Sequence, residues 1–302
     1  MNYLIKGISD PAEPRSRVVS RKLATSRWLE ISQKGSGSDL SFEISLDLEA
    51  KRIPWRKFFA TMATLLEDAE RLDVDITMLC CETIFHVVKY AISAGIPVTY
   101  HYVTPASYSF SQDPFQLHDR SDICQLPGFV ARVPETEGQK VHHVIALGFD
   151  GGRAQKFIER YSWRAEDTIA LVVDPEFVPE GRAQALAAAR PWLDEFKTIN
   201  PKVLQSVAVK PSAIARVLAR TLRDCKQLDL VLLGPKPLML GAAMFCNWLD
   251  DLERLHVRVL TDFAVPTAAR SSGIGSCFSI GQAEILEALT RCAPQLGPRN
   301  AL

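Results

Sequence analysis

The sequence predicts an α/β fold in which a Rossmann-like parallel sheet carries helices on both faces, with a β-hairpin near the N-terminus. After residue 141, near-continuous apolar runs alternate with amphipathic stretches, as expected of parallel strands that are covered on both faces. Two runs of alternating polarity within residues 27–48 flank a Gly/Ser turn, which is a hairpin pattern. Hydrophobic residues make up 47% of the 302 residues, enough for a substantial core.

Periodicity places the remaining elements in order. In the first half we expect a helix over 55–72, a strand over 74–81, a helix over 83–95 that ends at Gly95, and a strand over 97–103. In the second half the expected strands cover 142–149, 168–174, 203–209, 228–234 and 257–265. The expected helices of that half cover 151–162, 181–196, 211–225, 238–255 and 281–293.

A polar stretch with several prolines separates the two halves. We therefore expect an N-terminal α/β half with the hairpin over 1–115, a linker over 116–140 and a C-terminal Rossmann-like domain over 141–302. Residues 72–105 and 228–266 both read strand, turn, helix, strand and proline. Two interpretations of this similarity are open. Either an α/β unit was duplicated and the two halves are related, or any two β-α-β segments are similar to this extent by chance.

Composition narrows the function classes. Lys plus Arg and Asp plus Glu both total 35, so net charge indicates neither a nucleic-acid nor a membrane partner. No apolar run reaches the ~20 residues of a membrane span, and no secretory leader is recognised. Cysteines such as Cys80 and Cys246 lie in apolar runs, which favours buried thiols in a reducing cytoplasm. No spacing fits a metal site, and we expect no cofactor.

The turn Gly234-Pro235-Lys236 is the strongest candidate for chemistry, because ligands of parallel sheets bind beyond the carboxyl ends of strands. Gly234 permits a tight turn and the close approach of a ligand. The helix that follows points unpaired amide protons and the positive end of its dipole toward the turn, and Lys236 adds a full charge. These features suit a phosphate, although glycine and proline are also ordinary turn residues and lysine is commonly solvated.

Other strand ends supply further candidates. Asp150, Gly151 and Arg153 begin a helix, where Asp150 either caps the helix or binds a ligand; their spacing matches neither a dinucleotide fingerprint nor a Walker loop. Thr261 and Asp262 lie toward the carboxyl end of the last strand of the expected sheet.

Two loops and a histidine complete the candidates. Arg270, Ser271 and Ser272 belong to a small-residue loop that either wraps a ligand or acts as a linker. Asp174 sits in a turn as a metal ligand or a turn starter. His101 lies where it could face a site at the end of its strand.

Residues 234–239 (Gly-Pro-Lys-Pro-Leu-Met) resemble the glycine-lysine turn of CARF domains, the Rossmann-like sensor domains attached to CRISPR systems. The resemblance covers about residues 141–280. It implies that Lys236 helps to hold a cyclic oligonucleotide at a dimer interface. The loop from Gly148 to Arg153 departs from the family, whose corresponding loop is rich in Ser and Thr. The Arg-x₄₋₆-His motif of the associated nucleases does not occur in the sequence.

Three functions follow as hypotheses. The first is a cytoplasmic Rossmann-like sensor that binds a nucleotide or another phosphate-bearing ligand, in antiviral defence, and that signals to a homo-oligomeric mate or a protein partner. The second is a metal-dependent phosphodiesterase or transferase that uses strand-end carboxylates. The third is a structural subunit, which predicts an exposed apolar patch that includes Phe115, Leu117, Leu126 and Phe129.

Overall fold

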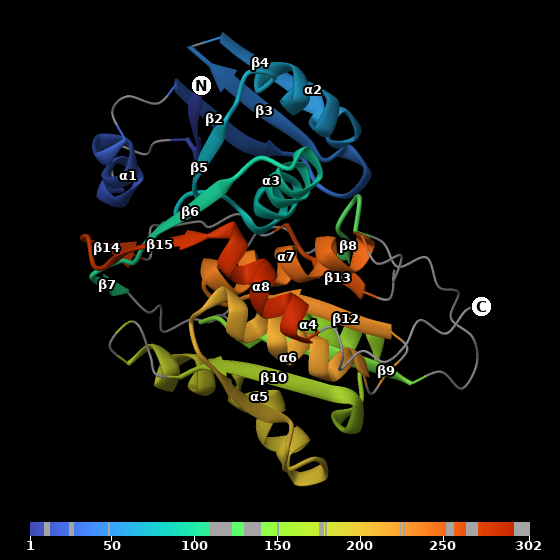
Figure 1. The fold of residues 1–302 in the computed structure, drawn as a ribbon. Helices are drawn as coiled ribbons and strands as arrows, with labels where there is room; N and C mark the ends of the chain where they lie inside the picture. Colours follow the sequence, from blue (N-terminus) through green and yellow to red (C-terminus); the bar gives the residue numbers. More distant parts are fainter. Residues whose placement is uncertain are drawn as a thin grey trace, which may run out of the picture. The chain divides into compact units, whose positions relative to one another are not determined.

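The protein is described from a computed structural model, in which the chain divides into two compact units. Unit 1 comprises 1–109 and 269–285, and unit 2 comprises 110–268 and 286–302. The described residues are 1–8, 13–23, 27–47, 49–108, 123–129, 140–149, 151–174, 178, 180–223, 225, 227–251, 257–263 and 271–292. The predicted α/β class is confirmed, with a mixed sheet and covering helices in each unit (Figure 1). Most of the expected 116–140 linker lies outside the described residues.

Unit 1 is built on a sheet with the order β15-β6-β5-β1-β2-β3-β4. Its four central strands β6, β5, β1 and β2 are parallel, and β15, β3 and β4 are antiparallel to their neighbours. The strands are β1 (Asn2–Gly7), β2 (Arg27–Lys34), β3 (Ser41–Leu46), β4 (Glu49–Pro54), β5 (Arg71–Asp75), β6 (Val98–Val103) and β15 (Cys277–Gly281). A separate pair consists of β7 (Ser107–Tyr108) and β14 (Ser271–Ser272).

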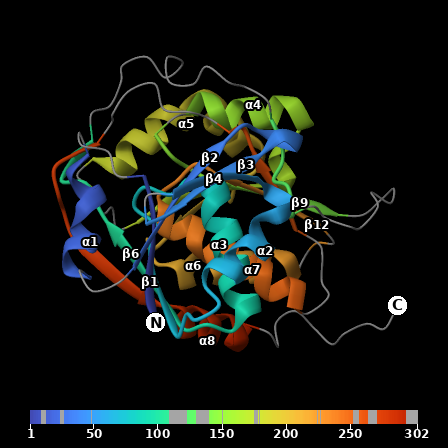
Figure 2. The ribbon, with the colours of Figure 1, turned by 90° about the horizontal axis from the view of Figure 1, so that it is seen from above.

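Helices cover both faces of the sheet in unit 1. Figures 1 and 2 show α1 on one face and α2 and α3 on the other. The helical elements are η1 (Pro14–Arg17), α1 (Val18–Lys22), η2 (Gly37–Asp39), η3 (Trp55–Lys57), α2 (Phe58–Leu65) and α3 (Cys81–Ala94). On the face of α2, the ring of Phe58 meets that of Phe42 edge-on, with 4.8 Å between centroids. On the face of α1, Val19 packs in a small cluster with Leu4 and Val103.

Unit 2 is built on a sheet with the order β11-β10-β9-β12-β13-β8, in which only the short β8 is antiparallel among the described strands. The strands are β8 (Cys124–Gln125), β9 (Val141–Ala146), β10 (Thr168–Val173), β11 (Leu204–Val207), β12 (Gln227–Leu232) and β13 (Val257–Thr261). The helical elements are α4 (Gly151–Tyr161), η4 (Ala165–Asp167), α5 (Gly181–Ile199), α6 (Pro211–Arg223) and α7 (Lys236–Asp251). The boundary between the units falls within α8 (Gln282–Cys292).

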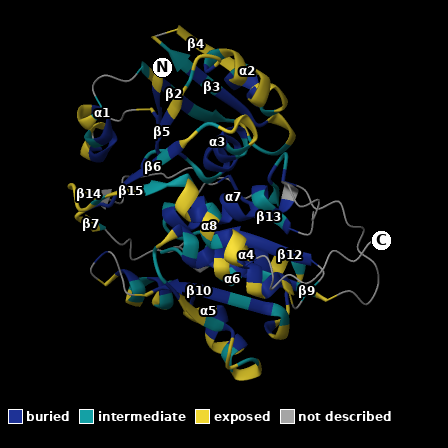
Figure 3. Ribbon diagram, viewed as in Figure 1, coloured by how far each residue is buried: buried dark blue, intermediate teal, exposed yellow. Residues whose placement is uncertain are grey.

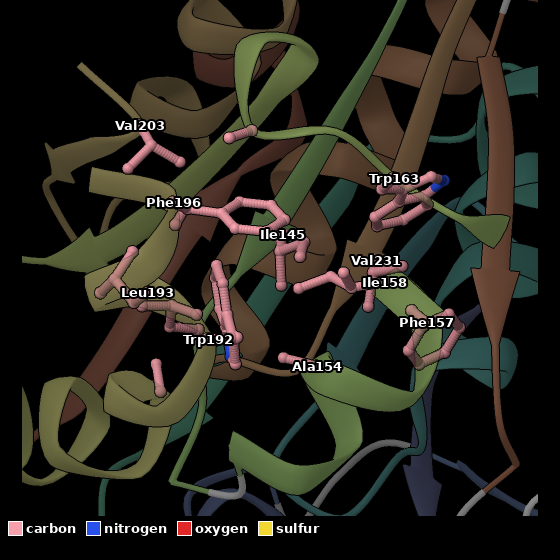
Figure 4. Packing of buried hydrophobic residues seen from close by; sticks show 14 of the residues in the cluster. Ile145, Ala154, Phe157, Ile158, Trp163, Trp192, Leu193, Phe196, Val203 and Val231 are labelled. Atoms are coloured by element: carbon pink, nitrogen blue, oxygen red, sulfur yellow. The ribbon is translucent and has the colours of Figure 1, made fainter. Parts of the chain in front are cut away.

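One hydrophobic cluster of unit 2 lies between the sheet and the helices α4 and α5. Ile145 and Val231 of the sheet pack with Phe157 of α4 and Trp192 of α5, and all four are almost fully buried (Figure 4). The strands β10 and β12 are buried along nearly their whole length, whereas α5 exposes its outer side (Figure 3). Apolar strands covered on both faces are the arrangement that their composition predicts.

The two segments with similar sequences occupy the same topological places. In unit 1, β5 leads through α3 to β6, and in unit 2, β12 leads through α7 to β13. The strand orders β15-β6-β5-β1-β2 and β8-β13-β12-β9-β10 match, including one antiparallel strand beside β6 and β13. The shared topology favours two related α/β halves over a chance likeness of two segments.

Several predicted elements can be compared with the structure one by one. The hairpin is confirmed, because β2 pairs with β3 and Lys34 lies opposite Ser41. Gly95 ends α3 in the left-handed conformation, at φ 67°. The strand expected over 74–81 instead ends at Asp75, whose carboxylate accepts a 2.9 Å hydrogen bond from the amide of Thr77 and so turns the chain. Among the described strands, β1, β4, β7, β8, β14 and β15 were not predicted.

Two of the four apolar residues expected in an exposed patch are buried. Leu126 has no exposed surface, and its amide donates to the carbonyl of Val259 at 2.8 Å. Phe129 is 8% exposed. Phe115 and Leu117 lie outside the described residues. The prediction of an exposed patch is therefore wrong for Leu126 and Phe129, because both join the core of unit 2.

Across the described parts of the chain, the structure holds no helix with both the length and the apolar character of a membrane span.

The crossing of α6 and α7 depends on Gly241. A Cβ atom at this position would lie 2.1 Å from the carbonyl oxygen of Pro211. We predict that Gly241→Ala lowers the free energy of unfolding by about 1–3 kcal/mol, the usual cost of overpacking. Gly181→Ala is the matched control, because its Cβ would meet the ring of Phe149 at an ordinary 3.5 Å. Urea denaturation of both variants tests this, and equal stabilities would contradict it.

Candidate functional site

The carboxyl ends of β9 and β12 form the topological switch point of unit 2. From β9 the chain proceeds to β10 and β11 on one side, and it then returns to β12 and β13 on the other. Open parallel sheets bind ligands in the crevice at such a reversal. Seven predicted site residues that the structure describes lie at or just beyond the carboxyl ends of β9, β12 and β13, and Thr261 is the last residue of β13. They are Gly151, Arg153, Gly234, Pro235, Lys236, Thr261 and Asp262.

Two glycines allow the loops after β9 and β12 to approach each other closely. A Cβ atom at Gly148 would lie 1.9 Å from the carbonyl oxygen of Leu233, and one at Gly234 would lie 2.9 Å from that of Leu147. Glycine is therefore needed at position 234 because two backbone segments touch there. This is a different reason from the tight turn and the ligand approach that the sequence suggested. Because the loops meet backbone to backbone, the start of α7 is held in a fixed place relative to the end of β9.

Two helices begin at this edge of the sheet. α4 starts at Gly151 and α7 starts at Lys236, and the first turn of neither helix contains an acidic residue. The amide of Leu238 donates to the carbonyl of Pro235 at 2.9 Å, which closes the first turn of α7. Lys236 itself is half-buried. The edge thus combines two positive dipole ends with a lysine.

Arg153 and Asp262 bind each other. The Nε and Nη2 atoms of Arg153 donate to the two carboxylate oxygens of Asp262 at 2.7 and 2.6 Å. The side chain of Asp262 is 4% exposed, so the pair is screened from water on the aspartate side. A bidentate arginine–carboxylate pair is strong and directional. Asp262 therefore neutralises Arg153 and ties the start of α4 to the end of β13.

The turn that presents Asp262 is strained. Phe263, the next residue, has φ 48°, a conformation that aromatic residues seldom adopt. Its amide donates to the Thr261 hydroxyl at 3.2 Å, and both side chains are buried. Thr261 thus stabilises the turn after β13.

The remaining predicted site residues lie elsewhere. Ser271 and Ser272 form β14 in unit 1, where the Ser272 hydroxyl pairs with that of Ser107 at 2.8 Å. Asp150 and Arg270 lie outside the described residues. Asp174 follows β10, where its Oδ2 is 3.4 Å from the Ser206 hydroxyl and 3.6 Å from Nε of Arg182. Within the described ranges, no group of three potential ligands could hold a metal ion.

A groove of about 980 Å³ lies in unit 1 between the β3–β4 hairpin and α2. Its lining includes Arg27, Lys51 and Lys57 together with Asp47 and Glu49. Arg27 forms an ion pair with Asp47. Charges of both signs are therefore mixed along the groove, which does not favour an anionic ligand.

A buried carboxylate that the sequence analysis missed lies at the amino-terminal half of β12. Asp229 has no exposed surface, and Arg258 donates to it through Nε at 2.8 Å and Nη2 at 2.7 Å. His143 donates from Nδ1 at 3.1 Å, and its ring stacks on Trp163 with 4.4 Å between centroids. A charged residue inside an apolar strand is the signal that could have revealed this cluster.

The protonation of Asp229 follows from these contacts. Burial raises the pKa of its carboxyl, but the hydrogen bonds from His143 and Arg258 and the charge of Arg258 outweigh burial and lower the pKa below its usual value. The folded state therefore favours the ionised form. Asp229 stabilises the fold at pH values above the pKa of the unfolded chain, and this contribution is lost as the pH falls through the folded pKa.

We predict that Asp229→Asn lowers the free energy of unfolding at pH 7 by about 3–5 kcal/mol, because Arg258 is left buried without its counter-charge. The difference from the wild type should narrow as the pH is lowered from ~5 to below ~4, because Asp229 is then protonated in the unfolded chain and the wild type begins to lose the stability that the ionised carboxylate contributes. Urea denaturation across this range measures both effects. Asp174→Asn, at a half-exposed carboxylate, is the control and should change stability by under ~1 kcal/mol. A cost that stays constant with pH would contradict the role of the ionised Asp229.

No protein-family model matches the sequence, and no curated protein matches it.

Proposed function

We propose that unit 2 binds a phosphate-bearing ligand of the nucleotide type at the carboxyl ends of β9 and β12. The observation that carries this proposal is the meeting of two helix N-termini at a topological switch point, with Lys236 as the first residue of one helix. Such an edge is where open parallel sheets bind ligands, and helix N-termini favour anions.

The electrostatics support an anion more than a neutral ligand. Each helix N-terminus stabilises a nearby negative charge by about 0.3–1 kcal/mol, and a hydrogen bond to a charged group contributes about 1.5–3 kcal/mol. Lys236 is half-buried, so its charge is less screened than that of a fully solvated lysine. In the proposal Lys236 contacts the phosphate, whereas Arg153 acts through Asp262 by holding α4 in place.

The proposal extends to sensing. The turn from Gly234 to Met239 resembles that of CARF domains, so we assign the ligand class of nucleotides or cyclic oligonucleotides and a role in antiviral defence. Recognition would shift the loops at the switch point and pass to a second copy of the chain or to a protein partner.

Binding is preferred over phosphodiester cleavage because of the state of two carboxylates. Cleavage with a metal needs carboxylates that are open to the ion. Asp262 already holds Arg153 in a bidentate pair, and Asp174 contacts Arg182 and Ser206. A recognition role requires neither carboxylate.

We predict that a nucleotide, a cyclic oligonucleotide or a sugar phosphate raises the unfolding temperature of the full chain. A ligand at a hundredfold excess over its Kd stabilises the fold by about 2.7 kcal/mol. Lys236→Ala should weaken the binding of such a ligand by about 10- to 100-fold, the loss expected for one charge-assisted hydrogen bond. Thermal shift identifies the ligand, and isothermal titration measures the affinities.

Lys202→Ala is the matched control. Lys202 is exposed and precedes β11, so it lies at the amino-terminal end of the parallel strands, away from the proposed site. Its replacement should change the affinity for the ligand by no more than about twofold. If both lysine variants bind equally well, or if no ligand in these classes changes the unfolding temperature, the proposed site is wrong.

A further inference from the structure

Three side chains on neighbouring strands of unit 1 form a continuous hydrogen-bonded chain. They are Ser279 of β15, His101 of β6 and Asp73 of β5, which lie on adjacent strands in the order β15-β6-β5. The Ser279 hydroxyl is 3.0 Å from Nδ1 of His101, and Nε2 of His101 is 2.8 Å from Oδ1 of Asp73. We propose that Ser279 is the nucleophile of an acyl-transfer site, with His101 as its general base and Asp73 as a positioning residue.

The order of the three groups fixes where the protons lie. An ionised carboxylate only accepts hydrogen bonds, so Nε2 of His101 must carry its proton and donate it to Asp73. In a neutral imidazole the other nitrogen is then an acceptor. The Ser279 hydroxyl therefore donates to Nδ1, the direction needed for removal of its proton.

Burial is graded along this chain of groups. The side chains of Asp73 and His101 are only 6% and 11% exposed, whereas Ser279 is exposed on the edge strand β15. The carboxylate and the imidazole are thus shielded, and the hydroxyl is open to a substrate. Shielding strengthens the interaction between the carboxylate and an imidazolium that forms during reaction. An orienting acid, a base and an accessible nucleophile are the parts that nucleophilic catalysis requires.

Arg71 supplies a positive charge on the same face of the sheet. Its Nη2 lies 3.7 Å from Oδ1 of Asp73 and donates to the Thr99 hydroxyl at 3.0 Å. Its side chain is 54% exposed, so the guanidinium is accessible to an incoming anion. Arg71 and His101 therefore approach the same carboxylate oxygen of Asp73.

The proposed step conserves atoms and charge. The Ser279 oxygen attacks the carbonyl carbon of an ester while its proton moves to Nδ1 of His101. The tetrahedral intermediate then expels the alcohol oxygen, which takes that proton from His101 and leaves an acyl ester on Ser279. Water repeats the sequence, releases the acid and restores the serine. The proposed substrate class is a carboxylic ester. The phosphoryl fluoride diisopropyl fluorophosphate reacts with the same hydroxyl: the Ser279 oxygen bonds to phosphorus, fluoride leaves and the hydroxyl proton passes to His101.

Hydrogen bonds among Ser279, His101 and Asp73 would also form if these side chains only linked neighbouring strands. The reactivity of the Ser279 hydroxyl distinguishes a catalytic role from this structural one. Full-length protein is incubated with diisopropyl fluorophosphate, and labelled peptides are mapped by mass spectrometry. We predict one adduct, on Ser279, and its absence in Ser279→Ala. Ser107→Ala is the matched control, because Ser107 is an exposed strand serine whose hydroxyl pairs with that of Ser272. This variant should label as the wild type does.

The base and the positioning residue are tested separately. His101→Gln should slow labelling by at least about 100-fold, since general-base catalysis typically contributes that much. Asp73→Asn should slow it similarly, because an amide can donate to Nε2 and turn the imidazole to the other tautomer. Nitrogen–proton NMR of the imidazole should show this change of tautomer, and circular dichroism should show an unchanged fold.

Two results would overturn the inference. One is a wild-type protein that carries no adduct on Ser279. The other is a His101→Gln variant that folds normally and labels Ser279 at the wild-type rate. Neither result bears on the phosphate ligand, because the two proposals use residues of different units.

Discussion

Each unit buries a carboxylate in its central parallel strand, and much of the surrounding structure satisfies that charge. Asp73 in β5 and Asp229 in β12 are each the third residue of their strand, and both are almost fully buried. An unpaired charge in such a place is very costly, so partners must be supplied by neighbouring strands. This requirement accounts for polar side chains within strands that are otherwise apolar.

The two units meet the requirement differently. In unit 2, Arg258 and His143 bind Asp229 from both neighbouring strands, and Trp163 stacks against the imidazole. The result is a closed cluster of cation, carboxylate and aromatic rings. In unit 1, Nε2 of His101 forms a hydrogen bond with the equivalent carboxylate, Asp73. The other ring nitrogen, Nδ1, forms one with the Ser279 hydroxyl on the edge strand β15. Both carboxylates have an arginine nearby, but the hydrogen-bonded chain that begins at Asp73 ends at the exposed hydroxyl of Ser279.

In unit 2 the Asp229 cluster and the proposed ligand site lie at opposite ends of the strands. The Asp229 cluster lies toward the amino-terminal ends of the strands, and the loops that carry Gly148 and Gly234 lie at the carboxyl ends. At the carboxyl ends Arg153 is paired with Asp262, and Lys236 is the first residue of α7. A rigid backbone contact between the loops keeps this edge in place, which is what a ligand site needs.

The α/β class, the hairpin and the position of the turn that carries Lys236 can be predicted from the amino-acid sequence, because periodicity, turn residues and the end of an apolar strand are local signals. The identity of neighbouring strands cannot be predicted in this way and is seen only in the folded protein. Arg153 meets Asp262 across 109 positions, and His101 meets Ser279 across 178. Strands pair through backbone hydrogen bonds that are the same for every sequence, so local patterns indicate that a strand forms but not which strand lies beside it. The function of a side chain in this protein depends on that neighbour.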